Sequence, residues 1–194
     1  MKRSLVFVAL CASAVLLLLG PVSVAAAGAW PTDMFLLSFG KGKTEARLYS
    51  DYFCSACKTL EPNIEYLLAD LVKRNIITIT FIDTPLHKQS TLYARYFLYI
   101  LNSKKEIGHA LKARSALFEA AQQNIADKEK LEAFLASKKI KFKPFDPQPV
   151  FAMLQHYLRS DRIRATPTCV LINGDKKDFY QGGPNITKIL ESLK

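Results

Sequence analysis

Short stretches of alternating or continuous apolar residues lie on both sides of a long helical region. Residues 34–39 and 45–50 form two such stretches, and residues 76–82 alternate isoleucine with threonine, a pattern typical of β-strands. Near the C-terminus, residues 169–172 and 177–180 flank Asn173-Gly174-Asp175, a sequence that favours a hairpin turn. These segments predict five strands, the last two joined as a hairpin.

Helical spacing begins directly after a pair of cysteines. From residue 55 onward, apolar residues recur every three or four positions, at Leu60, Ile64, Leu67, Leu68 and Leu71. Pro62 lies inside this helix and is expected to bend it. Further helices are predicted at 90–102, 105–124, 127–137, 148–159 and 184–193. The order of elements predicts an α/β fold, a mixed sheet flanked by helices with a helical block between its third and fourth strands.

The N-terminus has the layout of a secretory signal. Lys2 and Arg3 precede an uncharged apolar run over residues 5–19, and small residues follow at 24–29. We therefore expect residues 1–29 to be a signal peptide and residues 30–194 to form one exported domain. An uncleaved membrane anchor is the alternative, because the uncharged stretch continues to Pro31.

Composition is typical of a globular domain with a basic surface. The chain is 49% hydrophobic and 23% charged, with a net charge of +10, which excludes a disordered or fibrous protein. A local basic cluster spans residues 138–143. It is either a solvated loop or a surface attracted to anionic membranes or acidic partners. No nucleic-acid-binding motif is present, so nucleic acid is not an expected partner.

Three cysteines remain after the signal: Cys54, Cys57 and Cys169. An odd number does not fit a scaffold of paired disulfides. Cys54 and Cys57 open a helix, where the positive end of the helix dipole stabilises a thiolate. We therefore predict Cys54 as the attacking thiol and Cys57 as the resolving thiol. Ser55 and Ala56 between them supply no histidine, so the helix and the backbone must provide this stabilisation.

Other readings of the cysteines remain open. A zinc site would need a second ligand pair that the sequence does not supply, and a structural disulfide between Cys54 and Cys57 would close too small a loop to stabilise much. A copper chaperone could use the same thiols, but Met34 and Met153 are the only methionines after the signal. We expect neither a metal nor an organic cofactor. Cys169 is either a buried small hydrophobe or a regulatory thiol.

The motifs together resemble the thioredoxin superfamily, and within it the DsbA-like exported oxidoreductases. The Cys54-Ser55-Ala56-Cys57 helix with Pro62 is similar to the family's active-site helix, and Ala165-Thr166-Pro167-Thr168 is similar to its second hallmark loop. The resemblance implies a thioredoxin-like sheet with a DsbA-type helical insertion at about residues 86–162. It also implies a cis peptide bond before Pro167, with Thr166 and Pro167 facing the substrate.

The resemblance implies disulfide exchange with exported polypeptides in the periplasm or another extracytoplasmic space. It further implies a membrane redox partner that resets the cysteines, and we expect a monomer. Strongly oxidising members carry a Pro-His pair between the cysteines and a buried acid six positions before the first. Here Ser55-Ala56 and Leu48 occupy those places. Oxidase and reductase therefore both remain open, and the helical insertion favours an oxidase.

Overall fold

The computed structural model describes residues 36–194, and the predicted signal peptide at residues 1–29 lies outside this range. A five-stranded sheet has the order β1-β3-β2-β4-β5. Only β2 and β3 are parallel; the other neighbours are antiparallel. The strands are β1 (Ser38–Phe39), β2 (Thr44–Ser50), β3 (Ile77–Asp83), β4 (Thr168–Asn173) and β5 (Lys176–Gln181).

The first strand is shorter than the sequence pattern predicted. Ser38 and Phe39 alone pair with β3, while Leu36 and Leu37 form a turn of 3₁₀-helix. Leu37 is nevertheless fully buried. The apolar run therefore reflects burial in the core and not pairing along its whole length, two causes that hydrophobicity alone does not separate.

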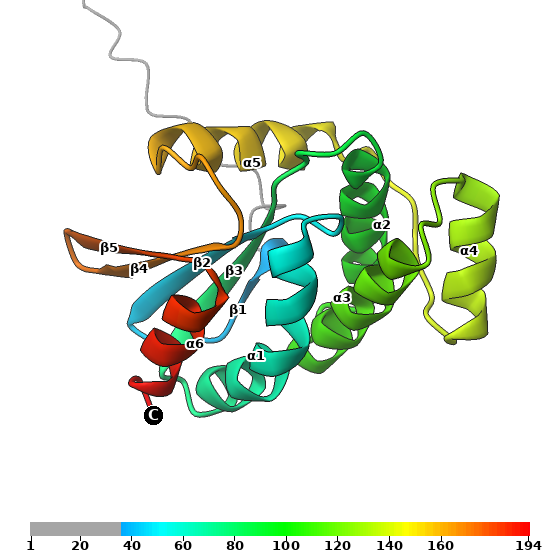
Figure 1. Cartoon of the computed structure of the whole chain (residues 1–194). Helices are drawn as coiled ribbons and strands as arrows, with labels where there is room; N and C mark the ends of the chain where they lie inside the picture. Colours follow the sequence, from blue (N-terminus) through cyan, green and yellow to red (C-terminus); the bar gives the residue numbers. More distant parts are fainter. Residues whose placement is uncertain (1–35) are drawn as a thin grey trace, which may run out of the picture.

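Helices cover both faces of the sheet. Figure 1 shows α1 (Ser55–Lys73) and α6 (Gly183–Glu191) below the sheet and α5 (Gln148–Ser160) above it. The predicted apolar face of α1 is buried, including Leu60, Ile64 and Leu68. Pro62 lies inside α1, and the ribbon changes direction partway along this helix, as an internal proline predicts.

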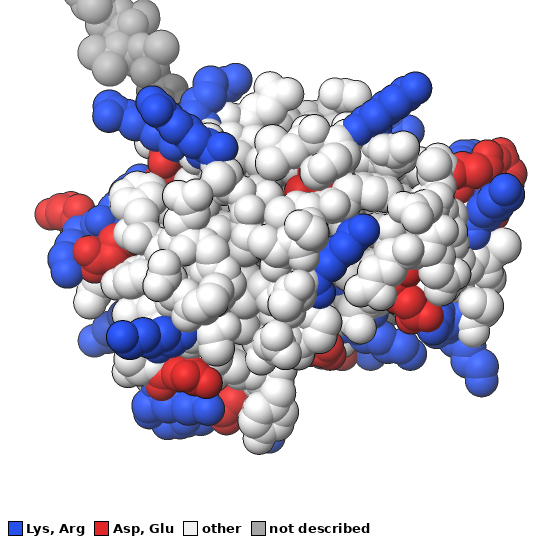
Figure 2. All heavy atoms as spheres, in the orientation of Figure 1, with Lys and Arg blue, Asp and Glu red and all other residues white. Residues whose placement is uncertain are grey.

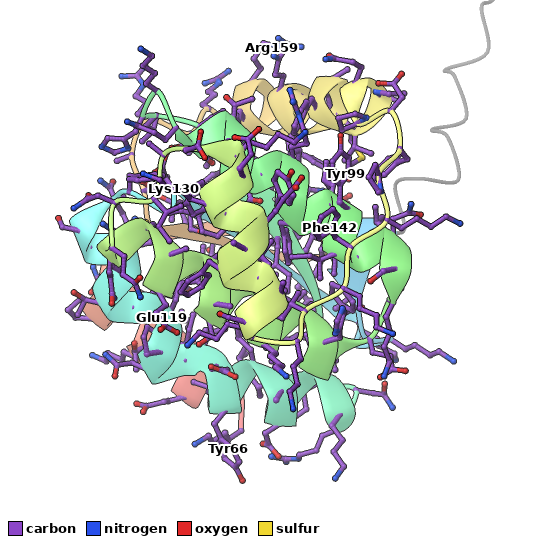
Figure 3. All side chains as sticks on the ribbon, turned by 90° about the vertical axis from the view of Figure 1, so that its right-hand side faces the viewer. Tyr66, Tyr99, Glu119, Lys130, Phe142 and Arg159 are labelled. Atoms are coloured by element: carbon purple, nitrogen blue, oxygen red, sulfur yellow. The ribbon has the colours of Figure 1, made fainter. Side chains whose placement is uncertain are left out.

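The predicted helical block between the third and fourth strands is present. It consists of α2 (Ser90–Ser103), α3 (Ile107–Gln122), α4 (Lys128–Ser137) and α5. The segment after α4 returns along α2, where the Lys143 amide donates to the Tyr99 carbonyl at 2.9 Å and the rings of Tyr96 and Phe142 lie 5.2 Å apart. Figure 3 shows Tyr99 and Phe142 in this seam. The insertion is therefore packed as part of the fold.

The two parallel strands, β2 and β3, end side by side in the middle of the sheet. Ser50 and Asp83, the last residues of β2 and β3, lie side by side in register. The chain leaves β2 through a short loop and enters α1 at Cys54, so the cysteine pair lies beyond the carboxyl ends of the parallel strands. Ligands and catalytic groups in open α/β sheets commonly lie beyond the carboxyl ends of the parallel strands. Among residues 36–194, no helix is both long and apolar enough to span a bilayer.

Candidate active site

Cys54 and Cys57 lie at the start of α1 in different environments. Cys54 is the N-cap residue of the helix, and its carbonyl accepts the Lys58 amide at 3.0 Å. Its side chain is partly exposed, whereas Cys57 is 0% exposed. Both are free thiols in this structure. A reactant in solution therefore reaches the sulfur of Cys54 and not that of Cys57.

The local electrostatics also separate the two thiols. The first turn of α1 contains no acidic residue, and no side chain caps its amides, so the positive helix end faces Cys54 without a competing anion. Burial raises the pKa of the Cys57 thiol well above its usual value. Burial therefore keeps Cys57 protonated, while Cys54 lies at the positive end of the helix dipole.

The Thr166–Pro167 peptide bond is cis, as the resemblance implied. It lies in the segment from α5 to β4, which brings Thr166 to the start of α1. The Cys54 thiol donates to the Thr166 carbonyl, with 3.5 Å between Sγ and O. The Pro167 carbonyl accepts the Gly182 amide at 2.9 Å, which fixes the loop against the end of β5. The structure thus unites two motifs that are more than one hundred positions apart.

Ser55 and Ala56 occupy the exposed first turn of α1. A groove of about 480 Å³ begins beside Ala56 and runs between α1 and α6, with Leu60, Pro184 and Thr187 among its lining residues. Its walls are largely apolar. This groove therefore begins next to the cysteine pair. The cis-proline loop contacts Cys54 separately, through the Thr166 carbonyl.

A buried carboxylate holds the loop before Cys54. Asp51 accepts hydrogen bonds from the amides of Phe53 and Leu86 and from the Ser90 hydroxyl, each at 2.7 Å. The Nδ1 atom of His87 lies 3.1 Å from the same carboxylate. Asp51 therefore ties the cysteine loop to the segment between β3 and α2. No local pattern assigns this role to Asp51, although the acid stands three positions before Cys54 in the sequence.

Arg114 forms a second buried polar cluster beneath the site. Its guanidinium is 1% exposed and donates to both oxygens of Glu61 on α1, at 2.6 and 3.1 Å. It also contacts Asp83 at 3.0 Å and the Ser50 hydroxyl at 2.5 Å. One α3 side chain thus joins the active-site helix to the ends of both parallel strands.

Aromatic rings enclose this arginine. The guanidinium carbon lies 4.6 Å from the ring centroid of Phe81 and 5.1 Å from that of Phe97. Burial raises the pKa of Asp83, and the charge of Arg114 opposes that rise. The acids that pair with Arg114 therefore come from α1 and β3, while Leu48, in the place of the family's buried acid, is an apolar core residue.

Sequence reasoning missed the cluster, but a signal for it existed. Glu61 follows Cys57 by four positions, on the face of the helix that carries the apolar residues. Arg114 likewise falls among buried alanines and leucines of α3. A charged residue on an apolar helical face predicts a buried partner, but not which one.

Cys169 lies in β4, 0% exposed and paired in register with Leu48 and Tyr180. Burial raises its pKa to about 12. These surroundings fit the buried-hydrophobe alternative for this thiol. Within residues 36–194, no three His, Cys, Asp or Glu side chains gather in a group that could hold a metal ion.

Solved structures share this architecture at low sequence identity. Wolbachia pipientis α-DsbA1 matches with a TM-score of 0.62 and 14% identity, over 81% of this chain and 89% of that one. The catalytic domain of Proteus mirabilis ScsC matches with a TM-score of 0.60 and 17% identity, over 82% and 93% of the two chains. A periplasmic thioredoxin-like protein of Salmonella enterica serovar Typhimurium gives 0.58 and 15%, over 86% and 98%. These likenesses establish the fold.

The sequence itself shows the family. No curated protein matches the chain. The model of the Thioredoxin_4 family, described as thioredoxin, matches residues 38–192, which include the cysteine pair and the cis-proline loop. The chain therefore belongs to the Thioredoxin_4 family, as a thioredoxin-like thiol–disulfide oxidoreductase of DsbA-type architecture.

Proposed function

We propose that this enzyme donates disulfides to exported polypeptides, with Cys54 as the exchanging thiol and Cys57 as the resolving thiol. One observation carries the assignment of roles: Cys54 is partly exposed at the start of α1, 3.5 Å from the Thr166 carbonyl, while Cys57 is wholly buried. Because only Cys54 is accessible, a substrate sulfur exchanges there.

The reaction balances as two successive exchanges. In the oxidised enzyme, a substrate thiolate attacks Cys54 Sγ, the bond to Cys57 breaks, and Cys57 leaves as a thiolate that takes up a proton. A second substrate thiolate then attacks the substrate sulfur of the mixed disulfide and releases Cys54 as a thiolate. Two electrons pass from the substrate to the cysteine pair, and the substrate gains a disulfide.

The environment of Cys57 supports donation over reduction. The raised pKa of Cys57 slows its attack on a mixed disulfide, because the thiolate is the nucleophile. The second thiol of the substrate then has more time to complete its own disulfide.

The surface around Cys54 supports a polypeptide substrate. An extended peptide pairs through backbone groups, and the partly exposed Thr166 lies directly beside Cys54 in the cis-proline loop. The groove beside Ala56 can take apolar side chains next to the reacting cysteine. We infer that residues 1–29 direct export, that the domain acts as a monomer, and that a membrane redox protein reoxidises the pair.

The reduction potential of the Cys54–Cys57 pair tests this proposal. Equilibration with glutathione should give a value of about −120 to −180 mV, within the oxidising range of related enzymes. A value near about −270 mV would instead indicate a reductase. The Cys54→Ser variant is the control and should show no two-electron transition. An absence of exchange in the unsubstituted protein would contradict the enzyme assignment itself.

A further inference from the structure

Three exposed arginines lead into the cis-proline loop. Arg159 lies in the last turn of α5, and Arg162 and Arg164 follow in the segment to β4. Within residues 36–194, none of them forms an ion pair. Figure 2 shows Lys and Arg side chains gathered at the upper left, where Figure 1 places the C-terminal end of α5. In Figure 3, Arg159 points away from the helix into solvent.

The carboxylate closest to these arginines in sequence is already engaged. Asp161 is buried and accepts hydrogen bonds from Arg47 at 2.9 Å, Lys177 at 2.6 Å and the Tyr49 hydroxyl at 2.6 Å. All three partners come from the sheet. The side chain of Asp161 is therefore turned inward, and it leaves the arginine charges uncompensated at the surface.

The backbone of Arg164 lies close to the loop that contacts the reacting sulfur. Arg164 is two residues before Thr166, so their Cα atoms are at most about 7 Å apart. The Thr166 carbonyl in turn lies 3.5 Å from Cys54 Sγ. A polypeptide that binds at Cys54 and continues along this loop comes within reach of the arginine side chains, and at physiological salt their attraction acts over a Debye length of about 8 Å.

Other positive charges lie around the site. Lys88, in the segment that Asp51 ties to the cysteine loop, is exposed, and Lys58 on α1 is partly exposed. The carboxylates that build the site are all buried with partners of their own: Asp51, Glu61 and Asp83. The charged side chains nearest Cys54 in these segments are thus positive, while the groove beside Ala56 is lined by one base, Lys188, and one acid, Glu191.

We propose that Arg162 and Arg164 determine substrate specificity, by favouring polypeptides with acidic residues beside the reacting cysteine. This inference rests on the proposed exchange function and names its substrate class. A substrate that pairs with the Thr166 backbone extends past Arg164, where its carboxylates meet the arginine side chains. Each such pair of exposed charges should raise kcat/KM about two- to fivefold.

The chain offers a matched pair of variants. Arg162 has a left-handed backbone with φ of 51°, directly after α5, and asparagine tolerates that conformation. Arg162→Asn therefore removes the charge without new strain, and Arg164→Gln retains side-chain length. Lys139 is exposed with φ of 56° directly after α4, and Figure 1 shows α4 on the opposite side of the molecule from the C-terminal end of α5. Lys139→Asn thus makes the same change far from the site.

The experiment compares two dithiol peptides that differ only in glutamate or glutamine beside the cysteine. With the oxidised enzyme at about 0.01 M salt, we expect kcat/KM to be about tenfold higher for the acidic peptide than for the neutral one. At about 1 M salt, where the Debye length falls to about 3 Å, kcat/KM should be about equal for the two peptides. The Arg162→Asn/Arg164→Gln variant should bring the ratio at low salt close to one. The Lys139→Asn variant should retain the preference.

The outcomes separate this inference from the proposed function. If the unsubstituted enzyme oxidises both peptides equally at low salt, or if Lys139→Asn lowers the ratio as much as the double variant, the specificity inference is wrong and the exchange function stands. If it oxidises neither peptide, the exchange function fails. Loss of binding to phosphatidylglycerol vesicles in the double variant, with no acidic-peptide preference, would assign the arginines to a membrane surface instead.

Discussion

At the scale of single residues, the two cysteines of the motif differ by position and not by chemistry. Cys54 caps α1 and is partly exposed, whereas Cys57, one turn later, faces the core. The same thiol group thereby receives a helix dipole in one place and a low-dielectric environment in the other. This difference divides attack and resolution between them.

The thiols should therefore differ in reactivity. In the native reduced protein at neutral pH, iodoacetamide should modify Cys54 first and leave Cys169 unmodified, because burial raises the pKa of Cys169 to about 12 and hides its sulfur. Mass spectrometry of the alkylated protein checks this. After denaturation, Cys54, Cys57 and Cys169 should all react. Modification of Cys169 as fast as Cys54 under native conditions would contradict the prediction.

Removal of the resolving thiol should trap substrates. In a Cys57→Ser variant, Cys54 forms a mixed disulfide with a substrate that carries a single activated disulfide, and no second enzyme thiol releases it. Non-reducing electrophoresis should show this adduct, and dithiothreitol should remove it by reducing the mixed disulfide. The Cys54→Ser variant should form none, since Cys57 is inaccessible. An equal amount of adduct in both variants would contradict the assigned roles.

At the scale of elements, a buried ion cluster connects α1 to the helical insertion. Arg114 on α3 binds Glu61 on α1 and Asp83 at the end of β3. The helix with the cysteines is thereby tied to the insertion and to the sheet at one point. Buried charges of this kind stabilise only while every partner is present, because an unpaired buried charge is costly.

Arg114→Met should consequently destabilise the protein by about 3–5 kcal/mol, since it leaves Glu61 and Asp83 buried without a cation. Urea unfolding followed by circular dichroism measures this. The triple variant Arg114→Met/Glu61→Gln/Asp83→Asn removes the uncompensated charges and should recover part of the loss. A cost below about 1 kcal/mol for Arg114→Met alone would show that the cluster does not hold the elements together.

At the scale of the whole molecule, Asp161 links the insertion to the sheet. It follows α5 and binds Arg47 and Tyr49 of β2 and Lys177 of β5. Burial by itself would raise the pKa of Asp161, but the hydrogen bonds from Lys177, Tyr49 and Arg47 outweigh it and hold that pKa below its usual value. The contacts between the end of α5 and the sheet therefore depend on the ionised form of the Asp161 carboxylate.

The stability that Asp161 contributes should depend on pH. A carboxyl group with a lowered pKa in the folded state contributes stability above its unfolded pKa of about 3.9, and this contribution is lost as the pH falls through the folded value. Asp161→Asn should lower the free energy of unfolding by about 2–3 kcal/mol near pH 7, and by about 1 kcal/mol less than that near pH 3. Urea titrations at both pH values check this. An equal loss at both would contradict the linkage.

Local patterns in the sequence predicted most of the elements and the reacting pair. The spacing of Leu60 and Ile64 indicates a helix that begins directly after Cys54, and the isoleucine–threonine alternation indicates β3. The cis bond before Pro167 came from the family resemblance. Such features depend on residues a few positions apart, so periodicity and short motifs suffice to predict them.

Tertiary structure decided which buried charges meet and how long β1 is. Arg114 and Glu61 are 53 positions apart, and Arg47 and Asp161 are 114 apart. Hydrophobic periodicity indicates that a charged residue on an apolar face needs a partner, but it carries no information on a partner from another element. The sequence by itself determined the helices, most strands and the cysteine pair, because these follow from local spacing. Only the packed fold decided their partners, because those contacts depend on how distant segments fill the same space.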